Sequence, residues 1–492
     1  MLFRSVQFTK PRSFDRNLVV IGAGSGGLVS AYLAAAMGAK VTLIEKGEMG
    51  GDCLNRGCVP SKALIRSGRL IAELRKAKEL GFIDATAQVD FAAVMARVQQ
   101  VVETIAPNDS IERYTQLGVE VLQGEGVITS PWSVQVGTQQ LTTRNIIVAT
   151  GARPRIPEIE GIESIDYLTS DNLWKLRELP KRLLVLGTGT IGCELAQVFA
   201  QLGSTVTLVG RDTLLPREDS EVRALFIQQF SEVEGIDLQL HKETVAFIKQ
   251  EGQQLLRLRD RQGSEQELNV AFDQVLIATG RIANTEGIGL EQVGVKVNGY
   301  GAVEANAYLQ THCPSIHVCG DVSGSYQFTH AASNQAWTAT INSLFGFLKR
   351  FKVNESVVPW ATFTTPEIAQ VGLNEQMAQQ QQLSYETTQF PFSELDRATA
   401  ASERLGWIKV ITVPGRDKIL GVTIVGEHAG DLLQEYVLAM RHGLGLNKIL
   451  ATIHPYPTFA EINQRVAGKW KREHAPKGLL QWAQRLHRWR RG

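Results

Sequence analysis

Apolar runs, glycine turns and helical segments recur in one order at two places in the chain, and each place predicts a strand, a turn, a helix and a second strand. The first copy occupies residues 17–46, where the apolar run Leu18–Ile21 precedes a glycine cluster and an alanine-rich segment. The second copy occupies residues 182–211. Two further apolar runs, within 146–157 and 275–285, each end in Ala-Thr-Gly. We expect the chain to pass between domains at these points.

Both turns have the glycine spacing GxGxxG. An acidic residue, Glu45, stands 23 positions after the first glycine of the first copy. Glycines let a backbone approach a pyrophosphate, the following helix N-terminus stabilises its charge, and a carboxylate accepts hydrogen bonds from a ribose. The pattern therefore predicts two dinucleotide-binding units, and the alternative is a tight strand–helix turn without a ligand. The glycines are Gly22, Gly24, Gly27, Gly187, Gly189 and Gly192.

From Val357 onward the pattern changes to strands followed by helices. Residues 406–413 and 419–426 are rich in β-branched residues, and residues 430–444 have helical composition. This order predicts a separate α+β domain.

Length and composition limit the class of protein. A chain of 492 residues should form more than one domain, and a net charge of +1 lacks the basic excess of a nucleic-acid binder. Five cysteines argue against a disulfide-stapled secreted fold. The first sixteen residues have no continuous apolar core, and no run of about 18 apolar residues predicts a membrane span. We expect a cytoplasmic protein, with an organellar transit segment left open.

Two of the five cysteines stand in one glycine-rich stretch, GGDCLNRGCVPSK, at residues 50–62. Cys53 and Cys58 would lie about 8–9 Å apart in a regular helix, beyond disulfide reach, so residues 55–57 must supply an irregular turn if the two are to meet. Cys58 would then stand near the start of a helix, where the dipole lowers the pKa of a thiol. A structural disulfide and a zinc half-site are the alternatives. The first is disfavoured in a reducing cytosol, and the second lacks further ligands at motif spacing.

The whole series of motifs resembles the FAD-dependent pyridine nucleotide–disulfide oxidoreductases. It runs from GxGxxG and Glu45 through CxxxxC-x-P-S-K, Ala-Thr-Gly, a second GxGxxG, Ala-Thr-Gly-Arg and Gly-Asp to TTPEIAQVGL at 364–373, and covers roughly residues 17–465. The resemblance implies an α/β protein with two doubly wound dinucleotide-binding domains and a C-terminal α+β dimerisation domain. The expected bounds are 17–152 with 282–350 for FAD, 153–281 for NAD(P)H, 357–468 for dimerisation and 469–492 for a basic tail.

The same resemblance assigns roles to individual residues. Cys58 would lie next to the flavin, Cys53 would attack the substrate, and Lys62 would pair with Glu194 beside the flavin N5. The plainer reading of that pair is a surface lysine and a helix glutamate. Besides the six glycines of the two turns, the cofactor contacts implied are Glu45, Gly51, Thr150, Gly151, Arg211, Arg217, Gly280, Arg281, Gly320 and Asp321.

The second dinucleotide unit has no counterpart of Glu45. The equivalent offset from Gly187 reaches Gly210 and then Arg211. Arg211, with Arg217, would suit a 2′-phosphate, which favours NADPH over NADH. If both arginines are merely solvated, this preference has no basis.

The C-terminal motif HPYPTFAE, residues 454–461, departs from the disulfide reductases of the family. Those enzymes have a histidine directly before Pro-Thr and a glutamate five residues after it. Here Tyr456 has the histidine position, Glu461 is in place, and His454 comes two residues early. A phenol with a pKa of ~10 is a poor acid–base catalyst near neutrality, but it is an acceptable metal ligand. The tyrosine resembles mercuric reductase, and so does the stretch 396–410.

These features lead to one prediction and several alternatives. The prediction is a homodimeric FAD enzyme with a redox-active disulfide that uses NADPH to reduce Hg(II) or a similar thiophilic ion, held transiently by Cys53 and Cys58. Two absences count against mercury: no cysteine follows Cys319, and no N-terminal CxxC domain is present. Copper or a quinone are other acceptors. A dihydrolipoamide dehydrogenase or another disulfide reductase, with His454 as catalyst, is the second hypothesis.

The third hypothesis is a redox-dependent flavoprotein that binds a membrane surface. It rests on residues 469–492, which hold eight Lys or Arg and only one acidic residue, Glu473. Apolar residues recur there at helical spacing, which is typical of helices that bind anionic membranes. A helix packed on its own dimer and a disordered tail are the alternatives. The apolar residues are Leu479, Trp482, Leu486 and Trp489.

Overall fold

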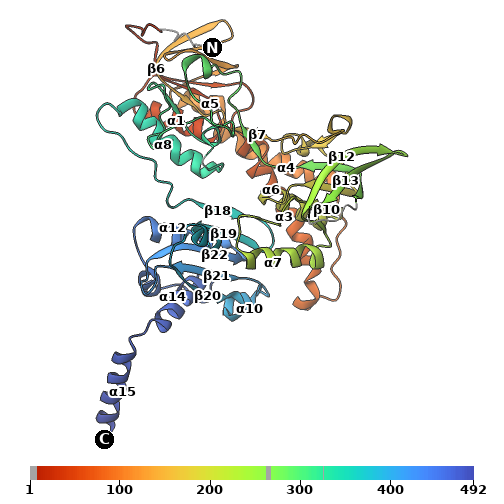
Figure 1. Cartoon of the computed structure of the whole chain (residues 1–492), viewed down its shortest axis with the longest axis vertical. Helices are drawn as coiled ribbons and strands as arrows, with labels where there is room; N and C mark the ends of the chain where they lie inside the picture. The colour runs from red at the N-terminus through yellow and green to blue at the C-terminus, as the bar shows by residue number, and fades with distance from the viewer. Residues whose placement is uncertain (1–7, 262–266, 325) are drawn as a thin grey trace. The chain divides into compact units, whose positions relative to one another are not determined.

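The computed structural model describes residues 8–261, 267–324 and 326–492, and the chain forms two compact units (Figure 1). The first unit comprises Met1–Ile71, Ala87–Thr213 and Phe230–Asn354. The second unit comprises Ala72–Thr86, Leu214–Gln229 and Glu355–Gly492. Two short segments from the N-terminal half of the chain thus pack with the C-terminal part.

The central strands β1 and β2 of the first sheet are parallel and are buried on both faces. Leu18, Val19 and Val20 are fully buried, because helices cover a parallel sheet and its strands become continuous apolar runs. The strand order is β3-β2-β1-β6-β5-β4, with β17 also paired to β6. The bounds are β1 Arg16–Ile21, β2 Val41–Glu45, β3 Val119–Gln123, β4 Gly126–Ser130, β5 Ser133–Val136, β6 Gln139–Val148 and β17 Ile316–Val318.

Helix α1 (Ser25–Ala36) joins β1 to β2, which pair in parallel, and α8 (Thr329–Phe345) packs against α1. Four further helices of this unit lie between β2 and β3 in the sequence, and two of them, α2 and α3, carry the cysteine motif. They are α2 Gly51–Asn55, α3 Cys58–Arg75, α4 Phe91–Ile105 and α5 Ile111–Gln116. The last four residues of α3 belong to the second unit.

A second parallel sheet repeats the strand–helix–strand plan in the order β11-β10-β9-β15-β8. Its elements are β8 Tyr167–Leu168, β9 Arg182–Leu186, α6 Thr190–Leu202, β10 Thr205–Val209, β11 Asp237–Gln239 and β15 Gln274–Ile277. An antiparallel sheet of β12 Lys242–Gln250, β13 Gln253–Asp260 and β14 Glu267–Phe272 accompanies it. A short strand follows each Ala-Thr-Gly motif, and these two strands, β7 (Ala152–Pro154) and β16 (Arg281–Ala283), pair in antiparallel fashion.

The second unit has a five-stranded antiparallel sheet in the order β18-β19-β22-β21-β20. The strands are β18 Pro359–Thr362, β19 Glu367–Gly372, β20 Glu386–Pro391, β21 Trp407–Thr412 and β22 Ile419–Gly426. The helices are α7 Ser220–Gln228, α9 Glu375–Gln380, α10 Asp396–Ala400, α11 Ala429–Leu432, α12 Gln434–Arg441, α13 Leu446–Ala451, α14 Glu461–Glu473 and α15 Lys477–Arg491. Tyr436, Phe392 and Ile424 are fully buried in its core. The predicted α/β fold with a C-terminal α+β domain is confirmed.

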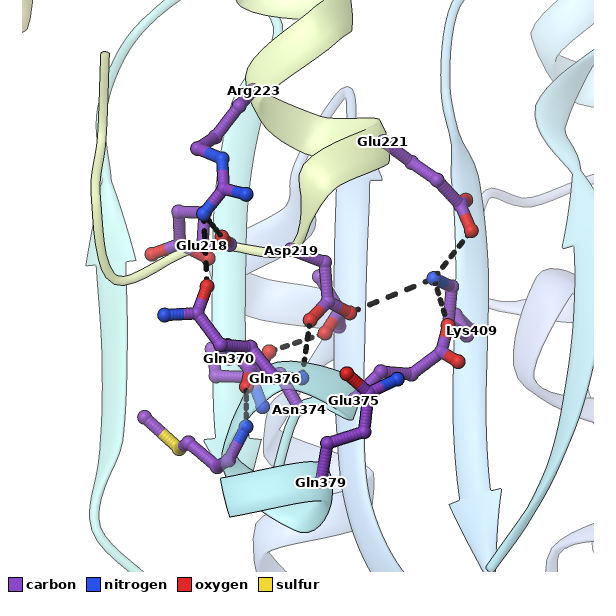
Figure 2. A network of polar contacts seen from close by, with 12 residues as sticks. Glu218, Asp219, Glu221, Arg223, Gln370, Asn374, Glu375, Gln376, Gln379 and Lys409 are labelled. Carbon is purple, nitrogen blue, oxygen red and sulfur yellow. Dashed lines mark hydrogen bonds and ion pairs between the residues drawn. The ribbon is translucent and has the colours of Figure 1, made fainter. Parts of the chain in front are cut away.

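A buried lysine joins the inserted segment 214–229 to this sheet (Figure 2). Lys409 on β21 has a side chain only 3% exposed. Its Nζ lies 2.6 Å from Glu375 and 2.8 Å from Glu221, and 3.5 Å from Asp219. An ammonium group is tolerated at such depth only when carboxylates surround it. The network therefore holds the start of α7 against the C-terminal sheet.

Within the described ranges, no helix has both the length and the apolar character needed to cross a bilayer.

Candidate active site

The two cysteines come from consecutive helices with a break between them. Helix α2 ends at Asn55, and α3 begins at Cys58. Asn55 closes the turn by donating its amide to the carbonyls of Met49 and Gly51, at 2.9 and 3.0 Å. The irregular turn expected at residues 55–57 is thus present, and both cysteines are free thiols.

A hydrogen bond between the two cysteines favours Cys58 as the thiolate and Cys53 as the proton donor. The Cys53 thiol donates to Cys58, and this bond is the main reason that the pKa of Cys58 falls to about 6. Two further groups lower it, the Thr329 hydroxyl at 3.4 Å from the sulfur and the nearby Lys62 ammonium. The same bond, with burial, raises the pKa of Cys53 far above its usual range. At neutral pH the pair therefore holds one negative charge, on Cys58.

Lys62 and Glu194 meet as the sequence led us to expect. Lys62 follows Cys58 by one turn of α3, and Glu194 lies on α6. Their side chains form an ion pair of 2.9 Å between Nζ and Oε2, with the Glu194 side chain only 5% exposed. A cation is thus held close to the cysteine helix, and its role toward a flavin stays a prediction.

The first glycine turn is shaped to admit a diphosphate. A Cβ on Gly27 would lie 1.7 Å from the Gly22 carbonyl oxygen, so only glycine lets α1 start this close to β1. Gly51 has φ +59°, and a Cβ there would lie 2.6 Å from the Cα of Gly24. Glu45, at the end of β2, accepts a hydrogen bond of 2.6 Å from the backbone of Ala23. The bare turn and the adjacent carboxylate fit the pyrophosphate and ribose of FAD.

Asp321 and Arg281 lie near the same cysteine helix. Arg281 pairs with Asp52, the residue before Cys53, and its Nε lies 3.6 Å from Asp321. Burial raises the pKa of Asp321 to about 6. Arg281 also donates to the Ala152 carbonyl at 2.7 Å. These contacts bring the Ala-Thr-Gly-Arg and Gly-Asp motifs to one place.

Three glycines and one threonine that the sequence analysis predicted as cofactor contacts lie at the Ala-Thr-Gly and Gly-Asp motifs. Thr150 donates its hydroxyl to the carbonyl of Asn284 at 2.6 Å, which joins the first Ala-Thr-Gly motif to the residue directly after β16. The glycines have left-handed backbones, which other residues rarely adopt. They are Gly151 (φ +68°), Gly280 (φ +119°) and Gly320 (φ +78°).

Two residues of this site escaped the sequence reasoning. Thr329 starts α8 and lies 271 positions from Cys58, so no local pattern connects them. Asp52 lies directly before Cys53, and this position was the one signal that could have identified it. No sequence pattern predicts Arg281 as its partner.

The second glycine turn repeats the first, but Gly210, followed by Arg211, stands at the position where the first unit has Glu45. A Cβ on Gly192 would lie 1.8 Å from the carbonyl of Gly187, and Gly189 has open space around it. Gly210 is confined, because a Cβ there would lie 2.4 Å from the Thr188 side chain. The next residue, Arg211, is exposed.

The carboxylate that follows Arg211 has a cationic partner of its own. Asp212, the carboxylate beside Arg211, is paired with Arg261 at 2.9 Å. Arg217 is also exposed and belongs to the segment that packs with the second unit.

The C-terminal motif separates His454 from Tyr456. The His454 side chain is only 6% exposed, and its Nε2 lies 3.1 Å from Glu435. Its Nδ1 lies 3.0 Å from the Thr452 carbonyl. Tyr456 is 68% exposed, and its hydroxyl donates to Asp396 at 3.1 Å. Glu461 is buried and accepts from the Thr458 backbone at 3.4 Å.

The three other cysteines, Cys193, Cys313 and Cys319, are buried. Among the residues that the structure describes, no group of three or more His, Cys, Asp or Glu side chains is placed to hold a metal ion.

Comparison with known proteins covers both units. Residues 16–336 match the family described as "Pyridine nucleotide-disulphide oxidoreductase", and residues 358–467 match its dimerisation domain. The chain is 35% identical to a mercuric reductase of Staphylococcus aureus, over 93% of this chain and 82% of that protein. It is also 35% identical to a dihydrolipoyl dehydrogenase of Chlamydia trachomatis, over 90% of this chain and 94% of the other.

Two solved structures have the same fold. One is the Cu(II) complex of the HOCl-induced flavoprotein disulfide reductase RclA from Escherichia coli, with a TM-score of 0.81 and 26% identity over 92% of this chain and 99% of that one. The other is LpdA from Mycobacterium tuberculosis, with a TM-score of 0.84 and 25% identity over the same shares of the two chains.

Proposed function

The chain belongs to the pyridine nucleotide–disulphide oxidoreductases, FAD-dependent enzymes that use NAD(P)H, and from this premise we propose that it uses NADPH to reduce thiophilic metal ions. Hg(II) is the leading acceptor, and Cu(II) is the second. The family, the enzyme class and the cofactors FAD and NAD(P)H that the sequence predicted are confirmed. The match to the dimerisation domain supports a homodimer.

The proposal rests mainly on the surroundings of His454 and Tyr456 in the C-terminal motif. Reduction of a disulfide releases a thiolate that needs a proton, usually from a histidine with a pKa near the working pH. His454 is held by Glu435 and the Thr452 carbonyl, and the residue directly before Pro457 and Thr458 is an exposed tyrosine. A soft metal ion needs thiolate ligands and electrons but no such proton.

The cysteine pair suits an ion of this kind. Cys58 offers a thiolate at neutral pH, and the incoming ion displaces the proton of Cys53, which leaves to water, so that two thiolates hold the ion. When bound, FAD supplies the pair of electrons taken from NADPH. Lys62, paired with Glu194, keeps a positive charge near the cysteine helix.

An acceptor panel with the FAD-loaded enzyme and NADPH tests the proposal. Hg(II) with excess thiol, Cu(II) without added thiol, lipoamide and glutathione disulfide are compared by NADPH consumption, with metal products measured directly. We expect turnover with a metal ion and rates at least about 100-fold lower with the two disulfides, which is the lower end of the usual contribution of a positioned acid–base group. Rapid turnover of lipoamide together with no metal reduction would overturn the proposal.

Dihydrolipoamide dehydrogenase activity is the second candidate, supported by the relatives of that name at 35% identity. It requires His454 to leave Glu435 and act as the acid. His454→Ala would then stop lipoamide turnover, whereas the metal reductase would keep its activity. Tyr456→His, with Glu461 five residues later, should raise the disulfide rates of a metal reductase.

A further inference from the structure

The last helix, α15, lies beyond the part of the chain that the family explains. The dimerisation match ends at residue 467, and α15 spans Lys477–Arg491. All fifteen of its residues are described, and none is buried. Figure 1 shows it as the final element of the chain, after α14. The proposed reductase chemistry gives it no task.

The helix has one apolar and one basic face. At 100° per residue, Leu479, Trp482, Leu486 and Trp489 fall within one narrow stripe. Three of them are widely open to solvent: Leu479 is 58% exposed, Trp482 59% and Trp489 78%. Such exposure of two indoles and a leucine on one stripe is unfavourable in water and indicates an interaction surface.

The opposite face has cations and no anions. Lys477, Arg488 and Arg491 lie on it, Arg485 lies beside the stripe next to Trp489, and residues 477–492 include no Asp or Glu. Arg490 lies at the border of the stripe, where its long side chain can reach from an apolar layer to a charged one. No carboxylate on the helix neutralises these charges, which favours an anionic partner.

We propose that α15 lies in the interface of membranes rich in anionic phospholipid, with its apolar stripe among the acyl chains and its cations at the phosphates. Tryptophan suits this position, because its ring is apolar and its N–H finds partners among headgroups. Two copies in a homodimer would attach the reductase at two points, which multiplies the affinity.

The charge pattern favours a lipid surface over two other partners of α15, a second copy of the helix and a nucleic acid. A second copy of α15 would bring like charges together, which opposes self-association. A nucleic acid would satisfy the cations but leave the Leu479–Trp489 stripe in water. An anionic surface with an apolar layer beneath it satisfies both faces.

Vesicle binding by the full-length, FAD-loaded protein tests the proposal. Vesicles of 30% phosphatidylglycerol in phosphatidylcholine are compared with pure phosphatidylcholine by flotation and by quenching of tryptophan with lipid-borne quenchers. We expect binding to the anionic vesicles only, weakened at least about tenfold when salt is raised to 0.5 M.

Three variants separate the two faces from a general charge effect. Replacing Arg485, Arg488 and Arg491 by Gln should weaken binding by about 100-fold, from three charges near an anionic surface. Trp482→Ser with Trp489→Ser should abolish tryptophan quenching by the lipid. The control removes three exposed cations outside the helix, Arg416→Gln, Lys418→Gln and Lys448→Gln, and should bind as the parent does.

Other outcomes would overturn the proposal. The proposal fails if the control variant loses as much vesicle binding as the arginine variant, or if the parent protein does not bind phosphatidylglycerol vesicles. It also fails if the parent protein forms higher oligomers without lipid and the Trp482→Ser, Trp489→Ser variant does not. Binding of duplex DNA more tightly than of vesicles would point to the other macromolecule. NADPH oxidation should be the same in every variant, since none of these residues belongs to the proposed catalytic machinery.

Discussion

At the residue scale, the chemistry depends on a single proton shared between two sulfurs. Cys58 is a thiolate because Cys53 donates to it, and Thr329 and Lys62 add to the effect. Cys58 is proposed to lie beside the bound flavin, where a thiolate would give a long-wavelength absorption band that reports its protonation.

We predict that this band in the two-electron-reduced enzyme is lost as the pH falls through about 6, the lowered pKa of Cys58. Cys58→Ser should remove it at every pH. Cys53→Ala removes the largest cause of the lowered pKa, so in that variant the midpoint should move to higher pH. A midpoint that stays near 6 in Cys53→Ala would show that the Cys53 thiol is not the donor.

The choice of nicotinamide belongs to the same scale. Arg211 follows a confined Gly210, and the neighbouring carboxylate is already paired with Arg261. We predict a higher kcat/KM with NADPH than with NADH, and a loss of about 10–100-fold for NADPH in Arg211→Glu, the usual value of a charge-assisted hydrogen bond.

The loss of kcat/KM for NADPH in Arg211→Glu should appear mainly as a higher KM, because a 2′-phosphate lies far from the reacting nicotinamide ring. Arg177→Glu, at another exposed arginine of the first unit, is the matched control and should leave the ratio unchanged. A parent enzyme that prefers NADH would contradict the assignment.

At the element scale, segment 214–229, which packs on the C-terminal sheet, contains the buried carboxyl group of Glu218. Its surroundings disfavour the ionised form. Burial raises the pKa of Glu218 from 4.5 to about 7. One oxygen accepts from Trp360 at 3.3 Å, and the other has no hydrogen-bond partner among the described residues. The folded protein therefore holds this proton more tightly than the unfolded chain does.

A raised folded pKa means that the stability from Glu218 is fully present below pH 4.5 and is lost as the pH rises through about 7. Glu218→Gln, which cannot ionise, should therefore raise the free energy of unfolding by about 3 kcal/mol at pH 8 and by less than about 1 kcal/mol at pH 5. Urea unfolding at the two pH values measures this difference.

Glu473→Gln replaces an exposed carboxylate of α14 and serves as the control, with a change of less than about 0.5 kcal/mol at both pH values. An equal gain at pH 5 and pH 8 in Glu218→Gln would mean that packing, and not ionisation, is the cause.

At the scale of the whole molecule, the family fold ends before the chain does. The dimerisation match stops at residue 467, and the core of the second unit includes α14 through Trp470 but no residue of α15. The dimer and the reductase site are thus expected to be independent of the last helix.

We predict that a chain ending at His474 keeps the dimer mass, its unfolding temperature within about 2 °C and its rate of NADPH oxidation, because no buried apolar area is lost. Light scattering, calorimetry and NADPH consumption measure the three quantities. A monomer, or a large fall in the unfolding temperature, would show that α15 packs on the dimer, which was one alternative in the sequence.

The elements that the sequence determined by itself depend on neighbours within about 30 residues. The GxGxxG turns, Glu45 at the end of β2 and the break between Cys53 and Cys58 could be predicted because backbone geometry within one strand–turn–helix unit permits few residue types. The stripe on α15 was equally local, since the helical period alone brings Leu479 and Trp489 to one face.

Tertiary structure alone decided the contacts between distant parts of the chain. Thr329 reaches Cys58, Arg281 reaches Asp52, and Lys409 gathers carboxylates from α7 and α9. It also decided that His454 turns to Glu435 while Tyr456 stays exposed. Such pairs form because packing of whole elements brings their side chains together, and the energy of a buried charge then selects its partners. No spacing along the chain contains that information.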